Sequence, residues 1–104
     1  MNQYKIAFDS MDWDSPAAGV RQKVVVQEAT QFRLLEFSKD FVELDWCTKG
    51  HAGYILDGQL EIDFNGKSIL YGPGDVATIP DGDDHKHKAK SVTDKVTIFV
   101  VENT

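Results

Sequence analysis

The sequence contains one cysteine, three prolines and no apolar run near the roughly 20 residues that cross a bilayer. A single cysteine cannot form an internal disulfide, so the core must hold the fold and Cys47 stays a free thiol. Lysine and arginine number 11 against 17 acidic residues, and the net charge of −6 argues against a nucleic-acid partner. The N-terminus lacks a signal-peptide pattern, so we expect a cytoplasmic protein without a membrane partner.

The length of 104 residues predicts a single domain, with 41% hydrophobic and 11% aromatic residues to fill one core. We expect an irregular N-terminal segment over residues 1–20 and a folded core over about 21–102. Residues 11–19, with a proline and small side chains, predict a surface loop that packs Trp13 onto the core. Residues 4–8 predict an edge strand, available to its own sheet or to a second copy.

Alternating polarity predicts the strands. Leu60, Ile62 and Phe64 share one face of a half-buried strand. The dipeptides Asp57-Gly58 and Asn65-Gly66 on either side are typical of two-residue hairpin turns, because their residues tolerate positive φ. Three successive antiparallel strands are therefore expected, at about residues 51–56, 59–64 and 67–71.

Five further segments also predict strands: residues 21–27, 32–37, 41–47, 76–79 and 96–101. Glycine and proline clusters at 72–75 and 80–82 separate two of them. About eight or nine short strands at close spacing indicate an all-β sandwich or barrel.

Side chains that bind metals stand where these strands are expected to end. Cys47, His51 and His85 provide the thiolate and imidazole groups that transition metals favour. His87 lies two residues beyond His85, so on one strand both would project to the same face. Each residue also has a plain structural reading: Cys47 as a small buried hydrophobe, the histidines as polar turn residues, and His87 as part of a solvated lysine-rich edge.

Four residues carry a resemblance to the cupin family. Gly74, Pro80, Gly82 and His85 match the second cupin motif, G-x5-P-x-G-x2-H-x3-N, whereas Ala89 replaces its asparagine. The first motif, G-x5-H-x-H-x3,4-E-x6-G, closes at Gly58 but is substituted: His51 takes its glutamate position, and Cys47 and Asp45 take its two histidine positions. The resemblance covers about residues 40–102.

The resemblance implies an all-β double-stranded β-helix, the jelly-roll cupin barrel, which frequently forms homodimers. It also implies a divalent transition metal inside the barrel, with zinc, iron or nickel suiting the ligand types. The implied ligands are Cys47, His51 and His85, with His87 as a further donor. The carboxylate of Asp45 either joins them or faces solvent.

Trp46 and Tyr54 are the candidate substrate-binding residues at the mouth of the pocket, and core packing is the alternative for both. Arg21, Lys23 and Arg33 would meet an anionic substrate if they faced inward, whereas pairing with nearby glutamates would make them surface charges.

We therefore expect a small metal-binding cupin that acts on a small organic acid, without assigning catalytic residues. The alternative is a non-catalytic cupin that binds a small molecule or serves as a sensor. A third, lower-ranked reading is an empty barrel that acts only as a dimerisation unit. Metal content separates the first two from the third.

Overall fold

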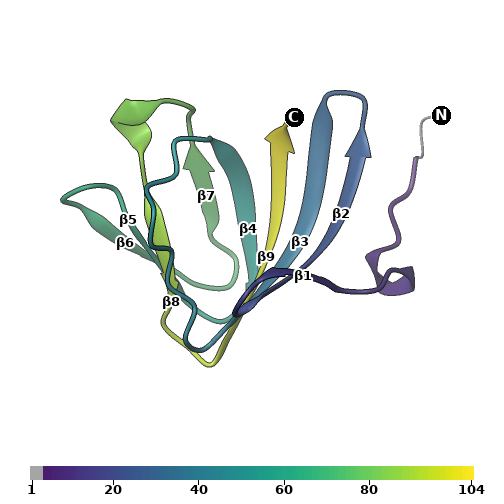
Figure 1. Ribbon diagram of the computed structural model, residues 1–104, viewed down its shortest axis with the longest axis horizontal. Helices are drawn as coiled ribbons and strands as arrows, with labels where there is room; N and C mark the ends of the chain where they lie inside the picture. The colour runs from purple at the N-terminus through teal and green to yellow at the C-terminus, as the bar shows by residue number, and fades with distance from the viewer. Residues whose placement is uncertain (1–3) are drawn as a thin grey trace.

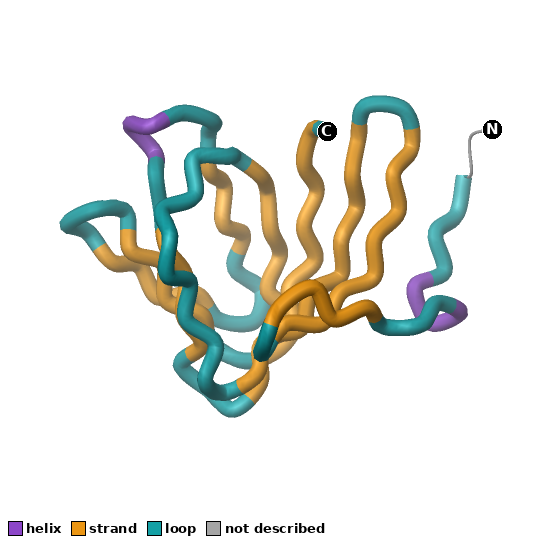
Figure 2. The backbone as a smooth tube through the Cα atoms, viewed as in Figure 1, coloured by secondary structure: helices purple, strands orange, loops and turns teal. Residues whose placement is uncertain are grey.

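The computed structural model describes residues 4–104, which form two antiparallel β-sheets (Figures 1 and 2). The strands are β1 (Asp14–Ala17), β2 (Val20–Gln27), β3 (Thr30–Ser38), β4 (His51–Asp57), β5 (Leu60–Asp63), β6 (Ser68–Tyr71), β7 (Val76–Ile79), β8 (Lys88–Ser91) and β9 (Lys95–Asn103). Two single 3-10 turns, η1 (Phe8–Ser10) and η2 (Asp83–His85), complete the elements. No helix within the described residues is long and apolar enough to span a membrane.

The large sheet has the strand order β1-β2-β3-β9-β4-β7, and the small sheet has the order β6-β5-β8. The sheets converge at the bottom of Figure 1 and spread apart toward the top. Isolated bridges join the chain between β3 and β4 to residues 87 and 90, through the pairs Val42↔Lys90 and Cys47↔His87. The all-β prediction is confirmed. The sheets are not closed into a continuous hydrogen-bonded barrel, although the arrangement is consistent with a jelly roll.

The core lies between the two sheets because alternate side chains of each strand point inward. On β9 the buried residues are Val96, Ile98 and Val100, while residues between them are more exposed. Leu35 of β3 pairs with Ile98, so neighbouring strands present their apolar side chains in register. The small sheet contributes buried side chains from β5 and β6, which are Leu60, Ile62 and Tyr71.

The two predicted hairpin turns have different outcomes. Asn65 and Gly66 both have positive φ, and β5 pairs with β6 around them, which confirms this hairpin. The hairpin predicted at Asp57-Gly58 is wrong, because β4 belongs to the large sheet and β5 to the small one. The dipeptide lies at the corner where the chain passes from the large sheet to the small one.

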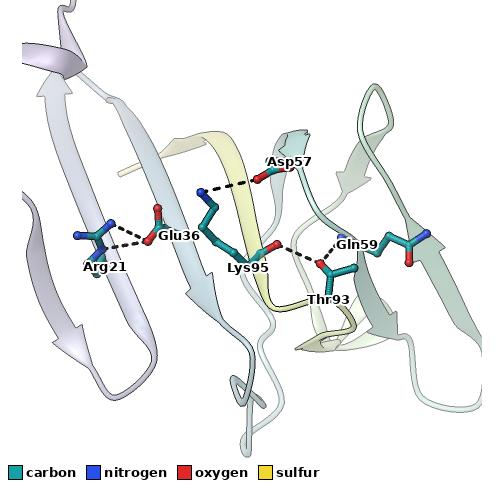
Figure 3. Close-up of polar contacts among 6 residues, drawn as sticks. All are labelled: Arg21, Glu36, Asp57, Gln59, Thr93 and Lys95. Carbon is teal, nitrogen blue, oxygen red and sulfur yellow. Dashed lines mark hydrogen bonds and ion pairs between the residues drawn. The ribbon is translucent and has the colours of Figure 1, made fainter.

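Hydrogen bonds fasten this corner to the turn between β8 and β9 (Figure 3). The backbone N–H of Gln59 donates to Thr93 Oγ1 at 2.9 Å, and the Thr93 hydroxyl donates to the Lys95 carbonyl at 3.0 Å. The Lys95 Nζ lies 3.8 Å from Asp57 Oδ2. Contacts with a different segment of the chain therefore fix the geometry of the corner.

Three local predictions upstream also need correction. Residues 11–19 contain strand β1 as well as loop, and Asp14 and Ala17 of this strand pair with β2. Residues 41–47 form two isolated bridges in place of a strand, and Figure 2 draws this stretch as loop. Residues 4–8 include no strand.

The N-terminal segment instead packs on the outer face of the large sheet. The Phe8 ring meets Phe99 edge-on at 6.0 Å between centroids, and the Phe8 carbonyl accepts a 2.8 Å hydrogen bond from Lys23 Nζ. Lys23 also lies 4.7 Å from the centre of the Trp13 ring. The expected packing of Trp13 on the core structure is thus present, through a cation–π contact.

Candidate functional site: a cavity between the sheets

A cavity of about 280 Å³ lies between the two sheets. Its walls are mainly apolar core residues from both sheets, among them Leu35, Leu60, Ile62, Ile98 and Val100. Polar side chains also line it: Gln22, Arg33, Glu43, Cys47, Lys49, His51, His87 and Glu102. Apolar walls with a few convergent polar groups are typical of small-molecule sites, and this volume is just below their usual range of about 300–1,000 Å³.

His51 and His87 approach each other from different elements. His51 begins β4, and His87 follows η2 and is only 3% exposed. Their ring centroids are 5.5 Å apart, with an interplanar angle of 69°. Two backbone hydrogen bonds, Cys47 N to His87 O at 2.9 Å and His87 N to Cys47 O at 3.0 Å, hold the His87 backbone in this position.

The backbone also fixes the donor and acceptor roles of the His87 ring. His87 Nδ1 lies 3.0 Å from the His85 carbonyl oxygen, which can only accept, so Nδ1 carries the proton. In the neutral ring the other nitrogen is then an acceptor. Burial lowers the pKa of His51 below its ordinary value of 6.5, and the neighbouring His87 lowers it further. Glu102 and a hydrogen bond with the Lys49 backbone act in the opposite direction on this pKa.

A charged cluster lies across β3 and β9 beside these histidines. Glu102 Oε1 lies 2.6 Å from Arg33 Nε and accepts a 2.7 Å hydrogen bond from Gln31 Nε2. Lys49 Nζ lies 3.9 Å from the other carboxylate oxygen. The Glu102 side chain is 2% exposed, whereas that of Lys49 is 49% exposed. Within residues 4–104, Arg33 Nε is buried without an aligned hydrogen-bond acceptor despite the short ion-pair distance.

Comparison with known proteins identifies the family to which this fold belongs. A family model described as the cupin domain matches residues 48–102, which is more than half of the chain. The chain belongs to the cupin family. No curated protein sequence is significantly similar to this cupin.

Solved structures share the same fold. KdgF from a Halomonas species has a TM-score of 0.76 at 21% identity, over 92% of this chain and 91% of that one. An RmlC-like cupin from Shewanella frigidimarina has a TM-score of 0.79 at 10% identity, over 98% and 91%. A transcriptional regulator from Vibrio cholerae has a TM-score of 0.67 at 10% identity, over 83% of this chain and 51% of the regulator. At these identities the likeness concerns the fold alone.

The cavity of this cupin brings together three of the four predicted metal ligands, Cys47, His51 and His87, as lining residues. His85 is the last residue of η2 and is exposed. The premise that His85 and His87 share a strand and a face is wrong, because the 3-10 turn ends between them. Asp45 is also exposed.

The donor set does not fit a site with three protein ligands. Among the described residues, no group of three or more histidine, cysteine, aspartate or glutamate side chains is close enough to hold a metal ion. The Cys47 thiol is directed to the Lys49 carbonyl, at 3.8 Å from sulfur to oxygen. Only the two histidines are arranged as neighbouring imidazole donors.

The two predicted substrate-binding aromatic residues lie outside the residues that line the cavity. Trp46 is 37% exposed, and the Nζ atoms of Lys88 and Lys86 lie 4.5 and 5.2 Å from its ring centre. Tyr54 is 44% exposed and lies opposite Val76 in the large sheet. Neither residue is part of the core.

The two arginines considered as substrate contacts lie on opposite faces of the large sheet. Arg21 donates to Glu36 from both Nε and Nη2 on the exposed outer face, as Figure 3 shows. Arg33 faces the cavity. Its partner Glu102 was missed in the sequence, although it extends the inward alternation of Val96, Ile98 and Val100 by one more step.

Proposed function

We propose that this cupin binds a small organic anion in the cavity between its sheets. The observation that carries the proposal is the position of Arg33 and Lys49 on a cavity whose other walls are largely apolar. A guanidinium and an ammonium group are the cations that recognise carboxylates in proteins. The apolar walls would accommodate the carbon skeleton of the same molecule.

The hydrogen bonding of Arg33 supports this proposal. Arg33 has five N–H donors, and its Nε lacks an aligned acceptor although it is buried. A carboxylate that binds other donors of this guanidinium would enter a site whose positive charge is already in place.

Titration calorimetry with a short-chain carboxylate such as hexanoate tests this proposal. Binding is expected in the native protein and is expected to weaken at least about tenfold in Arg33→Gln and Lys49→Gln. Arg21→Gln is the matched control, because Arg21 also pairs with a glutamate but lies on the outer face. Lys49 is half exposed, so its replacement leaves the core intact if Arg33→Gln fails to fold. Equal binding by all variants would contradict the proposal.

The predicted divalent metal remains a separate prediction, for which two histidines provide only two ligands. Any metal here would depend on water or a bound ligand for its remaining positions, so weak binding is expected. Metal analysis of untagged protein tests this. Metal that is lost in both His51→Ala and His87→Ala but retained in His85→Ala would support the histidine pair, and Cys47→Ala tests the thiol. His85 is the matched control because its side chain is exposed.

A sensor is one form that this binding function would take, with the bound anion altering contacts to a partner. A cupin enzyme that acts on the same anion is the other form. Incubation of the protein with bound carboxylates, followed by mass spectrometry of the ligand, separates the two. An unchanged ligand is expected for a binding module.

A further inference from the structure

The charges around the cavity suggest which anions it accepts. We infer that the cavity selects ligands with one carboxylate and an apolar tail, and that Glu102 is the residue that sets this selectivity. The inference rests on the proposed function, because it concerns the same cavity.

Within the cluster of Arg33, Lys49 and Glu102, one unit of positive charge is not offset. Arg33 and Lys49 contribute two positive charges, and the buried Glu102 carboxylate offsets one of them. Contacts with three residues hold that carboxylate, since Gln31 also donates to it at 2.7 Å. One ligand carboxylate therefore neutralises the cluster, whereas a second would be left without a counter-charge in a poorly solvated cavity.

The opposite wall offers no place for a second carboxylate. Glu43 lines the cavity next to β8, where its Oε1 accepts a 2.9 Å hydrogen bond from the Ala89 amide. This carboxylate would repel another one. The remaining surface of that wall is apolar, with Leu60 and Ile62 of β5. His87 Nδ1 is already engaged by the His85 carbonyl, 3.0 Å away, so this nitrogen is not free to donate to a second carboxylate.

A dicarboxylate is thus disfavoured for two reasons: Glu43 repels its second carboxylate, and no second positive charge is available to bind it. Hexanoate and adipate form a suitable probe pair, because they share a six-carbon chain and differ by one carboxylate. The native protein is expected to bind hexanoate at least about tenfold more tightly than adipate. In Glu102→Gln the available charge rises from one unit to two, so this ratio is expected to fall about tenfold, mainly through tighter adipate binding.

Matched variants keep the test independent of folding. Glu61→Gln is the control, because Glu61 pairs with Lys90 on the surface, 3.6 Å away, and does not line the cavity. Its hexanoate-to-adipate ratio is expected to equal that of the native protein. If Glu102→Gln does not fold, Glu43→Gln serves as the second variant and is expected to improve adipate binding at the opposite wall.

The outcomes distinguish the inference from the proposed function. Absence of binding by both acids would refute the anion-binding proposal and the inference with it. Binding of adipate as tight as that of hexanoate would refute only the selectivity. Tighter binding of 6-aminohexanoate than of hexanoate would show that Glu43 recruits a cation, which also overturns the apolar tail. A native preference for hexanoate that persists in a folded Glu102→Gln protein would remove the role of Glu102.

Discussion

Gly58 occupies a position where a larger residue would be strained and would clash with its neighbours. Its φ is +79°, and an added Cβ would overlap the Lys95 carbonyl oxygen at the fastened corner between the sheets. Gly58→Ala is therefore expected to lower the free energy of unfolding by about 2–4 kcal/mol, from left-handed strain and overpacking together. Urea denaturation measures this change. Gly66→Ala is the control, because φ there is +110° but the space is open, so a smaller loss is expected.

His51 gives the stability a dependence on pH. Because its pKa is below 6.5 in the folded protein, the unfolded chain takes up the proton first as the pH falls. Stability is thus expected to decrease from about pH 6.5 down to the folded pKa, and to decrease less in His51→Gln. Denaturation of metal-free protein between pH 7.5 and pH 5 checks this. His85→Gln should follow the native curve, and an equal decrease in His51→Gln would disprove the assignment.

The residues of the site were only partly predictable from the sequence. His51 lines the cavity and starts β4, a strand that the flanking turn dipeptides had predicted at residues 51–56. His85 and His87 were both expected to face the site, but only His87 lines the cavity, because a single 3-10 turn changes the direction of side chains and leaves no periodic signal. Glu102 was missed because an inward-facing glutamate at the end of an apolar strand resembles an ordinary polar strand end.

At the scale of elements, the ion pair of Arg33 and Glu102 links β3 to β9. Glu102→Ala would leave Arg33 with an uncompensated charge, and its side chain is only 26% exposed. We expect this substitution to lower the free energy of unfolding by about 2–4 kcal/mol. The surface pair of Glu61 and Lys90 is the comparison, for which Glu61→Ala should cost less than about 1 kcal/mol. Similar losses in chemical denaturation would show that burial does not distinguish the pairs.

A buried lysine contributes two of the contacts that attach the N-terminal segment. Lys23 is 8% exposed and donates to the Phe8 carbonyl beneath the Trp13 ring. Lys23→Ala is expected to increase proteolytic cleavage within residues 4–13 several-fold, because local unfolding of this segment becomes easier. Mass spectrometry of the early fragments measures this. Arg21→Ala provides the contrast, since Arg21 also contacts Trp13 but is exposed.

The positions of the strands in the sequence were more predictable than the pairing between strands. Hydrophobic patterns placed β2, β3, β7 and β9 within a few residues, and residues 76–79 match β7. The strand at 96–101 was predicted from a continuous apolar run, whereas β9 alternates between buried and more exposed residues. The dipeptide Asp57-Gly58 identified the boundary between two strands, but turn chemistry is local and does not decide which strands then pair. Residues 41–47 were predicted as a strand from their composition, whereas only two of their backbone positions find bridge partners.

For the whole molecule, the homodimer and the cytoplasmic location remain predictions. Sedimentation velocity at several protein concentrations tests the dimer. A species of about twice the 11.7 kDa chain mass is expected, and a monomer at every concentration would contradict it. The predicted route through an edge strand at residues 4–8 lacks support, because this segment packs on the outer face of the sheet.

The position of β9 has a consequence for synthesis of the protein. This strand comes after all the other described strands in the sequence, yet it lies in the middle of the large sheet, between β3 and β4. Until it emerges, β1, β2 and β3 have no ladder that connects them to β4 and β7. The nascent chain therefore cannot complete its largest sheet until β9 has been synthesised, so the two parts of that sheet are joined only afterwards.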